Sequence, residues 1–528
     1  MRIALAQLNY TVGDIKANTA KIIDAIERAK AQNADLVAFA EFAVCGTPAY
    51  GLLTKTTFLE LCEEAIESIA TKCRGIAAIV GTPYLTAEGP ISAAAYIDGK
   101  GNIEYIGKRH VSARREMGYI VGSSIGSQTI DVAGSKLKVV VGDDLSYIEE
   151  IGEEVDLVIS VNARRYGKGI LSRRFDNISR FAFAEGKNIM LINQVGGSGD
   201  IVYDGTSGIV NSEGKLLMLL KSFEEDLQIF DTKAENTPID VPYTTYKDRN
   251  AMLYKAACLG LRDYFHKNGY KKACVGLSGG IDSSVVACLA VGALGKENVK
   301  GLMMPSQFSS DESVEDAKIL AENLGIEYSV LPITEAYTAI MDTLKPVTGG
   351  TEFDATEENI QSRIRTVLLM ALQNKEGYVL LNSSNKSENA IGWCTLYGDT
   401  AGAFSVTGDL YKSEVYDLAR YINNRFDNVI PECILKKEPT SELRPNQKDS
   451  DILPPYEVVD AILFRMIEEG QHREEIINAG FDSEVVEKIH SMIMQNVKKR
   501  YQYPPVLRLS TRSFRHECLF PLVNKYGY

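Results

Sequence analysis

A glycine-rich turn between an apolar run and a helix-patterned run constrains the fold of this chain more than any other feature. Residues 273–277 (Ala-Cys-Val-Gly-Leu) predict a buried parallel strand, and residues 281–289 carry the apolar spacing of a helix. Ser278, Gly279 and Gly280 turn the chain between them, which leaves several backbone N–H groups pointing outward at the positive end of a helix. Such a turn is an anion cradle, and pyrophosphate is its usual occupant. An ordinary strand-to-helix turn is the alternative interpretation, because glycine is common in such turns.

Asp282 places a carboxylate beside this turn, where Mg²⁺ can bridge protein and phosphate oxygens. No Gly-Lys-Ser/Thr follows the glycines, so the turn is not a Walker loop. The segment Ser-Gly-Gly-Ile-Asp-Ser at 278–283 resembles the pyrophosphate loop of the ATP pyrophosphatases that adenylate their substrates. The resemblance implies ATP and Mg²⁺ as ligands, and it assigns the ATP phosphates to Ser278, Gly279, Gly280, Ile281, Asp282, Ser283 and Ser284.

Length, charge and cysteine usage exclude several classes of protein. A chain of 528 residues is too long for one core, so we expect two domains or slightly more. The net charge of −13 argues against a general nucleic-acid binder. No apolar run approaches membrane-spanning length, and the apolar stretch at the N-terminus is too short for a signal peptide. The nine cysteines form no Cys-x-x-Cys pair, so we expect a cytoplasmic protein without structural zinc.

The first half alternates strands and helices, which predicts a layered α/β sandwich with its chemistry at the strand ends. Glu41 follows one apolar run, Lys108 follows a predicted hairpin at 93–105, and Glu116 comes a short way further on. Each of them alone is more simply a surface charge. The predicted strands cover residues 3–7, 36–40, 76–80, 138–141, 157–161 and 189–193, and the predicted helices cover 15–32 and 58–72.

Together and in this order, these residues resemble the nitrilase superfamily, an αββα sandwich whose amidases use a Glu-Lys-Cys triad. The resemblance covers about residues 1–235, and it looks like the version that is fused to NAD synthetases. It implies Glu41 as the general base and Lys108 as the residue that stabilises the oxyanion. Gly142, however, stands where the family has its nucleophilic cysteine, directly after the predicted strand at 138–141. A glycine has no side chain that can attack an amide.

Other departures from the nitrilase pattern surround this position. Ser146 replaces an aromatic residue, and Arg164 and Arg165 stand where small residues and proline are typical. The segment between Lys108 and Glu116 is also shorter than usual. Cys45 is a possible replacement nucleophile, but it lies on another element, and a structural thiol is the favoured interpretation. We therefore expect the first half to be inactive as a glutaminase.

A polar stretch punctuated by prolines separates the two halves. We assign residues 236–248 to a linker and residues 249–528 to a doubly wound, parallel-sheet domain of Rossmann-like type. In its clearest predicted helix, at 356–370, we expect Thr356 as the N-cap and Asn359 and Arg363 facing a ligand together. The buried face of this helix is predicted as Ile360, Ile364, Val367 and Leu368. Further strands are predicted at 299–304, 328–332 and 378–381, and further helices at 250–268 and 313–324.

The segment Asn-Lys-Ser-Glu at 385–388 follows the predicted strand at 378–381. It places a cation, Lys386, and a carboxylate, Glu388, at the same sheet edge as Asp282. A solvated polar loop is the alternative interpretation of this segment alone. Beside the phosphate loop, Asp282 and Glu388 predict a Mg²⁺ site.

Five motifs in this order resemble NAD synthetases, with highly specific matches over about residues 245–528. They are the loop at 278–283, Pro-Ser-x-x-Ser-Ser at 305–310, Thr-x-Glu-Asn-Ile-Gln-x-Arg-Ile-Arg at 356–365, Asn-Lys-Ser-Glu at 385–388 and Thr-Leu-Tyr-Gly-Asp at 395–399. The resemblance implies that ATP adenylates deamido-NAD, releasing pyrophosphate, and that ammonia then displaces AMP. It assigns Ser383 and Lys412 to ATP, and it assigns Asn359, Glu388, Trp393, Asp399 and Lys499 to deamido-NAD. It also implies a homodimer or a larger homo-oligomer.

The two halves together resemble the glutamine-dependent NAD synthetases, with a defective glutaminase half. Gly142 then implies that nitrogen comes from ammonia, with glutamine used only if cysteine stands at position 142. Another adenylating amidotransferase, such as a relative of the GMP synthetases, is a rival that the motifs at 385–388 and 395–399 argue against. A pseudoenzyme or assembly protein that kept both folds is a second rival, and the retained loop, the metal carboxylates and Lys499 argue against it.

Overall fold

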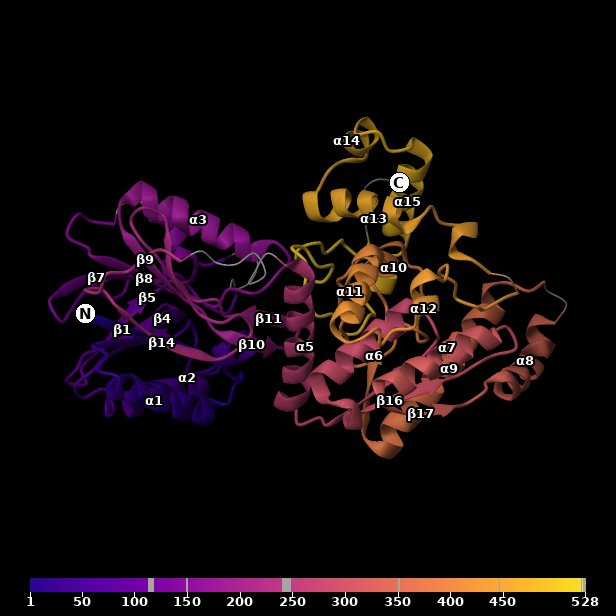
Figure 1. Ribbon diagram of the computed structural model, residues 1–528, viewed down its shortest axis with the longest axis horizontal. Helices are drawn as coiled ribbons and strands as arrows, with labels where there is room; N and C mark the ends of the chain where they lie inside the picture. Colours follow the sequence, from indigo (N-terminus) through magenta and orange to yellow (C-terminus); the bar gives the residue numbers. More distant parts are fainter. Residues whose placement is uncertain are drawn as a thin grey trace. The chain divides into compact units, whose positions relative to one another are not determined.

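The computed structural model describes residues 1–112, 118–148, 151–239, 248–349, 352–445, 447–523 and 525. The chain divides into two compact units, Met1–Arg249 and Asn250–Tyr528, which carry the indigo-to-magenta and the magenta-to-yellow colours of Figure 1. Glu116 and residues 240–247 of the predicted linker lie outside the described residues. Within the described ranges, no helix has both the length and the apolarity that crossing a membrane requires.

The first unit consists of two six-stranded sheets with helices on both outer sides, which confirms the predicted αββα sandwich. In Figure 1, α1 and α2 lie on one side of the strands, and α3 lies on the opposite side. The first sheet has the order β14-β1-β2-β3-β4-β5, and the second has the order β13-β12-β9-β8-β7-β6. The first sheet contains β1 (Arg2–Gln7), β2 (Leu36–Ala38), β3 (Ala77–Thr86), β4 (Gly89–Ile97), β5 (Ile103–Gly107) and β14 (Asp226–Asp231). The second contains β6 (Thr129–Val132), β7 (Ser135–Val141), β8 (Leu157–Val161), β9 (Asn188–Ile192), β12 (Gly208–Val210) and β13 (Leu216–Leu219). The remaining elements are the hairpin β10 (Val195–Ser198) and β11 (Ile201–Asp204), and the helices α1 (Ile15–Ala31), α2 (Thr56–Ala70) and α3 (Ile170–Glu185).

Alternating side chains along the strands hold these layers together. In β1, Ile3 and Leu5 join the apolar core between the two sheets, whereas Ala4 and Ala6 join the core beneath α1 and α2. In β7, Val139 and Val141 are fully buried in the core between the sheets. The chain therefore leaves the buried layer directly at residue 142, at the carboxyl end of a strand that pairs in parallel with β8.

The second unit contains one five-stranded, wholly parallel sheet with the order β17-β16-β15-β18-β19. The chain runs outward from β15 to β17 and then returns to the other side of β15, so the strand order reverses between β15 and β18. Ligands of such sheets bind beyond the carboxyl ends of the strands at this reversal. The predicted doubly wound fold is confirmed, and it brings the loop after β15 next to the loop after β18. The strands are β15 (Lys272–Gly276), β16 (Val299–Met303), β17 (Glu327–Val330), β18 (Tyr378–Asn382) and β19 (Phe404–Ser405). The helices are α5 (Arg249–Lys267), α6 (Ile281–Leu294), α7 (Asp311–Leu324), α8 (Thr334–Thr348), α9 (Ala355–Glu376), α10 (Lys386–Ile391), α11 (Lys412–Arg425), α12 (Glu432–Lys436), α13 (Tyr456–Phe464), α14 (Arg473–Asn478), α15 (Ser483–Gln495) and α16 (Val497–Arg500).

Two predictions about α9 are wrong. The N-cap is Asp354, whose carboxylate accepts a hydrogen bond from the backbone N–H of Thr356 at 2.6 Å, so Thr356 already lies inside the helix. Val367 was expected on the buried face but is 67% exposed. Ile360 and Ile364 are buried as predicted. The buried face of α9 therefore differs from the one that its apolar pattern indicates. Polar residues of α9, such as Ser362, are buried as well and line the cavity described next.

Candidate functional site

The phosphate loop follows β15 and is shaped by glycine. Gly279 has a φ of +77°, and a Cβ at this position would lie only 2.2 Å from the carbonyl oxygen of Ser313. Any L side chain would therefore be strained and would also collide with the first turn of α7. The Ser278 hydroxyl accepts a hydrogen bond from Gly280 N at 3.2 Å, which tightens the turn. The loop packs closely against α7, and the residues of the loop also line a cavity.

This cavity has a volume of about 670 Å³ and lies wholly within the second unit. The hydroxyls of Ser283 and Ser284, whose predicted role is to bind ATP phosphates, donate to the carbonyl oxygen of Gly280 at 3.1 and 2.7 Å. These two hydrogen bonds stabilise the conformation of the loop. Most of the other predicted residues of this half line the cavity: Ser278, Gly279, Gly280, Ile281, Asp282, Asn359, Ser383, Glu388, Trp393, Asp399, Lys412 and Lys499.

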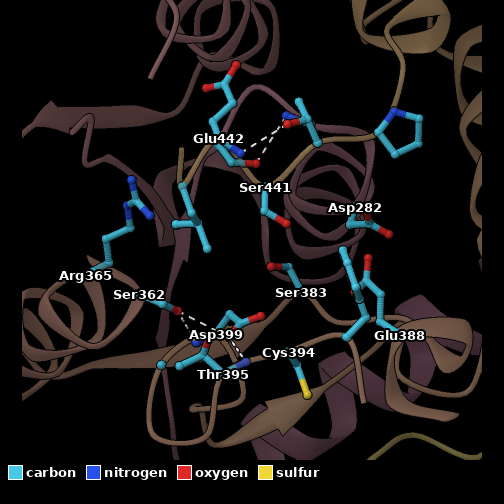
Figure 2. A pocket seen from close by; sticks show the side chains of 18 of the residues that line it. Asp282, Ser362, Arg365, Ser383, Glu388, Cys394, Thr395, Asp399, Ser441 and Glu442 are labelled. Carbon is cyan, nitrogen blue, oxygen red and sulfur yellow. Dashed lines mark hydrogen bonds between the residues drawn. The ribbon is translucent and has the colours of Figure 1, made fainter. Parts of the chain in front are cut away.

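Two carboxylates and a lysine gather at one side of the cavity. Lys412 Nζ lies 2.5 Å from Asp282 Oδ2 and 3.5 Å from Glu388 Oε1. Figure 2 shows Asp282 and Glu388 together on this side. Burial raises the pKa of Glu388 to about 8, and the charge of Asp282 adds to the effect while Lys412 opposes it. Burial would lower the pKa of Lys412, but the charges of Asp282 and Glu388 outweigh it and raise that pKa.

This donor set fits a Mg²⁺ ion that arrives with a nucleotide. Mg²⁺ in such sites takes one or two carboxylates and completes its shell with phosphate oxygens and water. Among the described residues, no group of three or more His, Cys, Asp or Glu side chains is arranged to hold a metal by itself. Asp282 and Glu388 are the two carboxylates at the phosphate loop, and a cation between them would favour the ionised form of Glu388. Two carboxylates alone do not complete the coordination of Mg²⁺, so phosphate oxygens of the nucleotide would have to supply further ligands.

A second group of polar residues lies farther along the cavity. The Thr395 hydroxyl donates to Asn359 Oδ1 at 2.6 Å, and Thr395 N donates to Asp399 Oδ1 at 2.7 Å. Figure 2 shows Asp399 beside Ser362 and Thr395, with dashed lines for hydrogen bonds among these residues. Burial raises the pKa of Asp399, although its hydrogen bonds work in the opposite direction. Lys499 is held by the carbonyl oxygens of Gly392 and Cys394. These side chains offer both donors and acceptors to a polar ligand.

Seven charged residues that line the cavity were not predicted: Glu358, Arg365, Lys437, Glu438, Glu442, Arg444 and Asp449. Arg365 donates from Nε to the carbonyl oxygen of Met304 at 3.0 Å, and burial lowers the pKa of its guanidinium. Lys437 and Glu442 also line the cavity, from the segment after α12. Arg365 stands in the Arg-Ile-Arg motif and could have been found there. Lys437 and Glu442 lie in an irregular segment, where no periodic pattern reveals which side chains turn inward.

Arg363 was expected at the ligand and Lys386 at the sheet edge beside Asp282, and neither residue lines the cavity. Arg363 donates to the carbonyl oxygen of Leu396 at 3.2 Å and is not among the lining residues of the cavity. Lys386 is fully buried, with its Nζ 3.1 Å from Asp409 Oδ1 and 2.5 Å from Glu468 Oε1. Glu468 belongs to a π-helical turn, Arg465–Glu469. Lys386 therefore does not bring its charge to the cavity, because the buried carboxylates of Asp409 and Glu468 bind it.

The first unit brings Glu41, Lys108 and Gly142 together. Lys108 Nζ lies 3.2 Å from Glu41 Oε1, and both side chains are buried. The Ser92 hydroxyl donates to the same carboxylate oxygen at 2.8 Å. Gly142 opens the 3₁₀ turn Gly142–Tyr147 with a φ of +61°. A Cβ at Gly142 would lie 2.5 Å from Lys108 Nζ and 3.1 Å from Glu41 Oε1. The end of Lys108 therefore occupies space that a side chain at position 142 would need.

Two acidic side chains next to Gly142, Asp143 and Asp144, contact neighbouring segments. Asp144 is buried and accepts hydrogen bonds from the backbone N–H groups of Arg109 and His110, both at 2.8 Å. Arg164 lies 3.6 Å from Asp143, whereas Ser146 is exposed. These contacts fix the segment that follows Lys108 against the turn at 142.

Cys45 does not have the properties of a replacement nucleophile. Its side chain is fully buried, and burial holds the pKa of its thiol well above the usual range. The thiol also hydrogen-bonds the carbonyl oxygen of Gly46. A reactive cysteine needs a lowered pKa and access to solvent, so this environment supports a structural thiol.

Comparison with known proteins matches both units. The carbon–nitrogen hydrolase family matches residues 2–237, and the NAD synthase family matches residues 253–503. The glutamine-dependent NAD(+) synthetase of Aquifex aeolicus is 38% identical, with all of each chain covered, and that of Thermotoga maritima is 37% identical, over 100% of this chain and 99% of its own. Among solved structures, the glutamine-dependent NAD+ synthetase of Acinetobacter baumannii in complex with adenosine diphosphate has a TM-score of 0.78 and 34% identity, over 99% of this chain and 98% of its own. The enzyme of Cytophaga hutchinsonii has the same fold, with a TM-score of 0.85 and 21% identity, over 100% of this chain and 98% of its own. The identity and the coverage of both units place this chain in the family of glutamine-dependent NAD(+) synthetases.

Proposed function

We propose that this protein makes NAD(+) from deamido-NAD in two steps within the cavity of the second unit. A carboxylate resists attack by an amine, because oxide is a very poor leaving group. ATP therefore adenylates the nicotinate carboxylate and releases pyrophosphate, after which ammonia displaces AMP. The observation that carries the proposal is the cluster of Asp282, Glu388 and Lys412 beside the phosphate loop, at the point where the strand order reverses.

The residues of this cluster have complementary tasks. The N–H groups of the loop at 278–280 bind the phosphates that leave as pyrophosphate, and Lys412 balances their charge. Asp282 and Glu388 would hold Mg²⁺, which supplies positive charge to the phosphate oxygens when bound. Ser383 lies on the loop after β18 and lines the cavity, where it can contact the same nucleotide.

Deamido-NAD is assigned to the other group of lining residues. Asn359, Trp393, Asp399 and Lys499 line the cavity together with Glu388, which supports a site that spans from the cluster at Asp282 to α9. Lys499 is anchored by two backbone carbonyl groups, so it presents its charge at a fixed position. Calorimetric titration with deamido-NAD should detect binding, and Lys499→Met should weaken it without changing the affinity for ATP.

We further propose that the nitrogen comes from free ammonia and not from glutamine. The triad chemistry of the first unit requires a nucleophile, and Gly142 provides none. Lys108 Nζ lies 2.5 Å from the place of a Cβ at position 142, so the lysine occupies space that an attacking side chain would need. The site thus has the general base and the lysine of a glutaminase, Glu41 and Lys108, but Gly142 supplies no attacking atom.

Nitrogen-source kinetics test both parts of this proposal. NAD(+) formation is measured with saturating ATP and deamido-NAD, first with ammonium chloride and then with purified glutamine. We expect turnover with ammonium, rising with pH as more of it is deprotonated, and negligible turnover with glutamine. Adding a separate glutaminase to the second reaction should restore turnover, which shows that the synthetase half is intact. Equal rates with glutamine and ammonium would refute the ammonia proposal, and no turnover with either would refute the synthetase proposal.

A homodimer or larger homo-oligomer and a cytoplasmic location complete the proposal. The first unit buries two apolar layers and keeps a full sandwich despite Gly142, which supports a structural task for it. Light scattering during size-exclusion chromatography should give a mass of at least two chains. Cell fractionation should recover the protein in the cytoplasmic fraction. A fully active monomer would contradict the first expectation.

A further inference from the structure

One buried side chain connects the two carboxylates of the nucleotide site. Asn385 is fully buried at the end of the loop after β18 and is the N-cap of α10. Its Nδ2 donates to Asp282 Oδ1 at 2.9 Å, and its Oδ1 accepts from the backbone N–H of Glu388 at 2.9 Å. Asp282 and Glu388 belong to different helices, α6 and α10. A single amide group therefore contacts one carboxylate directly and fixes the backbone that carries the other.

These contacts determine which oxygen atoms face the ligand. Asp282 has its Oδ1 engaged by Asn385, so its Oδ2 is the atom that meets Lys412 at 2.5 Å. Glu388 Oε2 is turned toward the backbone N–H of Asn385, at 3.4 Å, and its Oε1 faces Lys412. Each carboxylate thus keeps one oxygen on the Asn385 side and presents the other on the Lys412 side.

Only a side chain with a donor and an acceptor on one short, rigid group can make both contacts. Aspartate has the shape of asparagine but no N–H group, so it can cap the helix and cannot donate to Asp282. Serine can also cap a helix, but it is too short to reach both partners. Asn385 itself is not among the residues that line the cavity, so it acts through its neighbours.

We propose that Asn385 is a positioning residue that sets the orientation of Asp282 and Glu388 toward the polyphosphate and its metal ion. The inference rests on the proposed nucleotide site and adds to it a residue that does not touch the substrate. The competing explanation is that Asn385 only caps α10 and stabilises the fold. The two explanations differ because a cap affects stability alone, whereas the bridge to Asp282 affects the binding of metal and nucleotide.

Two substitutions separate these roles. Asn385→Asp keeps the shape and the cap but replaces the donor to Asp282 with a repelling carboxylate. Asn385→Ser keeps a cap and removes the bridge without adding charge. Asp482→Asn is the matched control, because it makes the reverse exchange at the exposed N-cap of α15, where Asp482 accepts from Val485 N at 3.0 Å.

The measurements are calorimetric titration of the full chain with α,β-methylene-ATP in MgCl₂, electron paramagnetic resonance of Mn²⁺ binding in the presence of this analogue, and the thermal midpoint. For Asn385→Ser we expect about tenfold weaker binding of the analogue and of Mn²⁺, as for the loss of a hydrogen bond to a charged group. For Asn385→Asp we expect at least a tenfold lower kcat with ammonium. Asp482→Asn should match the parent in every assay.

The outcomes are distinguishable from a failure of the proposed function. If the parent protein binds the analogue and makes NAD(+), while Asn385→Ser and Asn385→Asp lower the thermal midpoint without changing binding or kcat, then Asn385 is only a cap and the inference is wrong. Parent-like behaviour of both variants in all assays also overturns the inference. If the parent itself neither binds the analogue nor makes NAD(+), the nucleotide site is wrong, and the inference falls with it.

Discussion

The two lysine–carboxylate clusters of this chain use the same kinds of side chain in opposite ways. In the second unit, Lys412 lies between Asp282 and Glu388 at the edge of a cavity of about 670 Å³. In the first unit, Lys108 is buried against Glu41, and its Nζ lies 2.5 Å from the place of a Cβ at residue 142. One lysine faces space that a substrate can occupy, whereas the other occupies the space of a missing side chain.

The difference shows that the residue types alone do not reveal whether such a cluster is active. A buried charge pair is tolerated when its partners satisfy one another, whatever its chemical use. What distinguishes the clusters is the backbone around them: Gly279 lets the phosphate loop pack closely against α7 at the edge of the cavity, whereas Gly142 offers the pair at Lys108 no side chain. Each experiment below disturbs one side of this comparison.

Asp282→Ala should have the largest effect on activity. Removing a carboxylate that supports charge neutralisation on the leaving pyrophosphate should lower NAD(+) formation by about 10²–10³-fold or more. The variant should still fold, because Glu388 remains as a partner of Lys412. Steady-state rates with ammonium at saturating Mg²⁺ provide the measurement, and circular dichroism checks the fold. Activity within a few-fold of the parent would show that the cluster at Lys412 is no more catalytic than the one at Lys108.

Lys386→Met should have the largest effect on stability. Lys386 is fully buried between Asp409 and Glu468, and its Nζ also donates to the Ser510 hydroxyl at 2.8 Å. Removing one partner of a buried charge network leaves the carboxylates unpaired and costs about 3–5 kcal/mol. Urea unfolding followed by fluorescence should show this loss. Lys436→Met, which removes an exposed ion pair with Glu432, should leave the midpoint nearly unchanged, and equal shifts for the two variants would contradict the prediction.

Gly142→Cys tests the other cluster directly. A side chain in the left-handed conformation at φ +61° should lower the free energy of unfolding by about 1–2 kcal/mol. The collision involves the end of Lys108, a flexible side chain that can move, so the variant should fold. We expect it to release ammonia from glutamine at a measurable rate, because Glu41 and Lys108 are still present. Gly142→Ala is the control for strain, and it should remain inactive toward glutamine.

Failure of Gly142→Cys to use glutamine would show that more than the nucleophile has been lost. Arg164, which pairs with Asp143, and the exposed Ser146 would then be the next positions to change. Labelling of the new thiol with iodoacetamide would show whether it forms a thiolate at all.

Glu388 should produce a pH dependence of stability in the ligand-free protein. Its pKa is raised from about 4.5 to about 8, so the folded state holds a proton that the unfolded state releases. The free energy of unfolding should therefore fall as pH rises from about 4.5 to about 8, with the loss complete above that range. Glu388→Gln should flatten the profile in this window. Parallel profiles for the parent and the variant would contradict the raised pKa.

The sequence was sufficient for the parts of the fold that repeat regularly. Apolar runs such as 157–161 identified buried strands, and Gly279 with Gly280 identified the phosphate loop, because both features follow from local backbone chemistry. The reversal of strand order then places Asp282 and Glu388 at one edge, as their positions after two strands predicted. The assignment of individual residues to ATP or deamido-NAD remains a prediction.

Side chains whose direction depends on distant partners could not be predicted. Lys386 turns away from the cavity because Glu468, from a π-helical turn, and Asp409 bind it on the other side. Arg363 donates a hydrogen bond to the carbonyl oxygen of Leu396 and does not line the cavity, whereas Arg365 does. Asp354 replaced Thr356 as the N-cap because it lies one residue before the helix and can reach Thr356 N. The apolar periodicity of a helix depends on the sequence of that helix alone, so it carries no information about hydrogen-bond partners from distant segments.

The buried pair of Glu41 and Lys108 also affects how related sequences are interpreted. Losing either partner of a buried ion pair is strongly destabilising, so selection for folding alone is enough to keep both residues, with or without glutamine hydrolysis. Their presence in a relative is therefore no marker of glutamine hydrolysis. On the proposed function, the informative position is the residue that follows β7, because this residue would have to supply the attacking atom. If nitrogen-source kinetics bear out the ammonia proposal, relatives with glycine at this position would also depend on ammonia from another source.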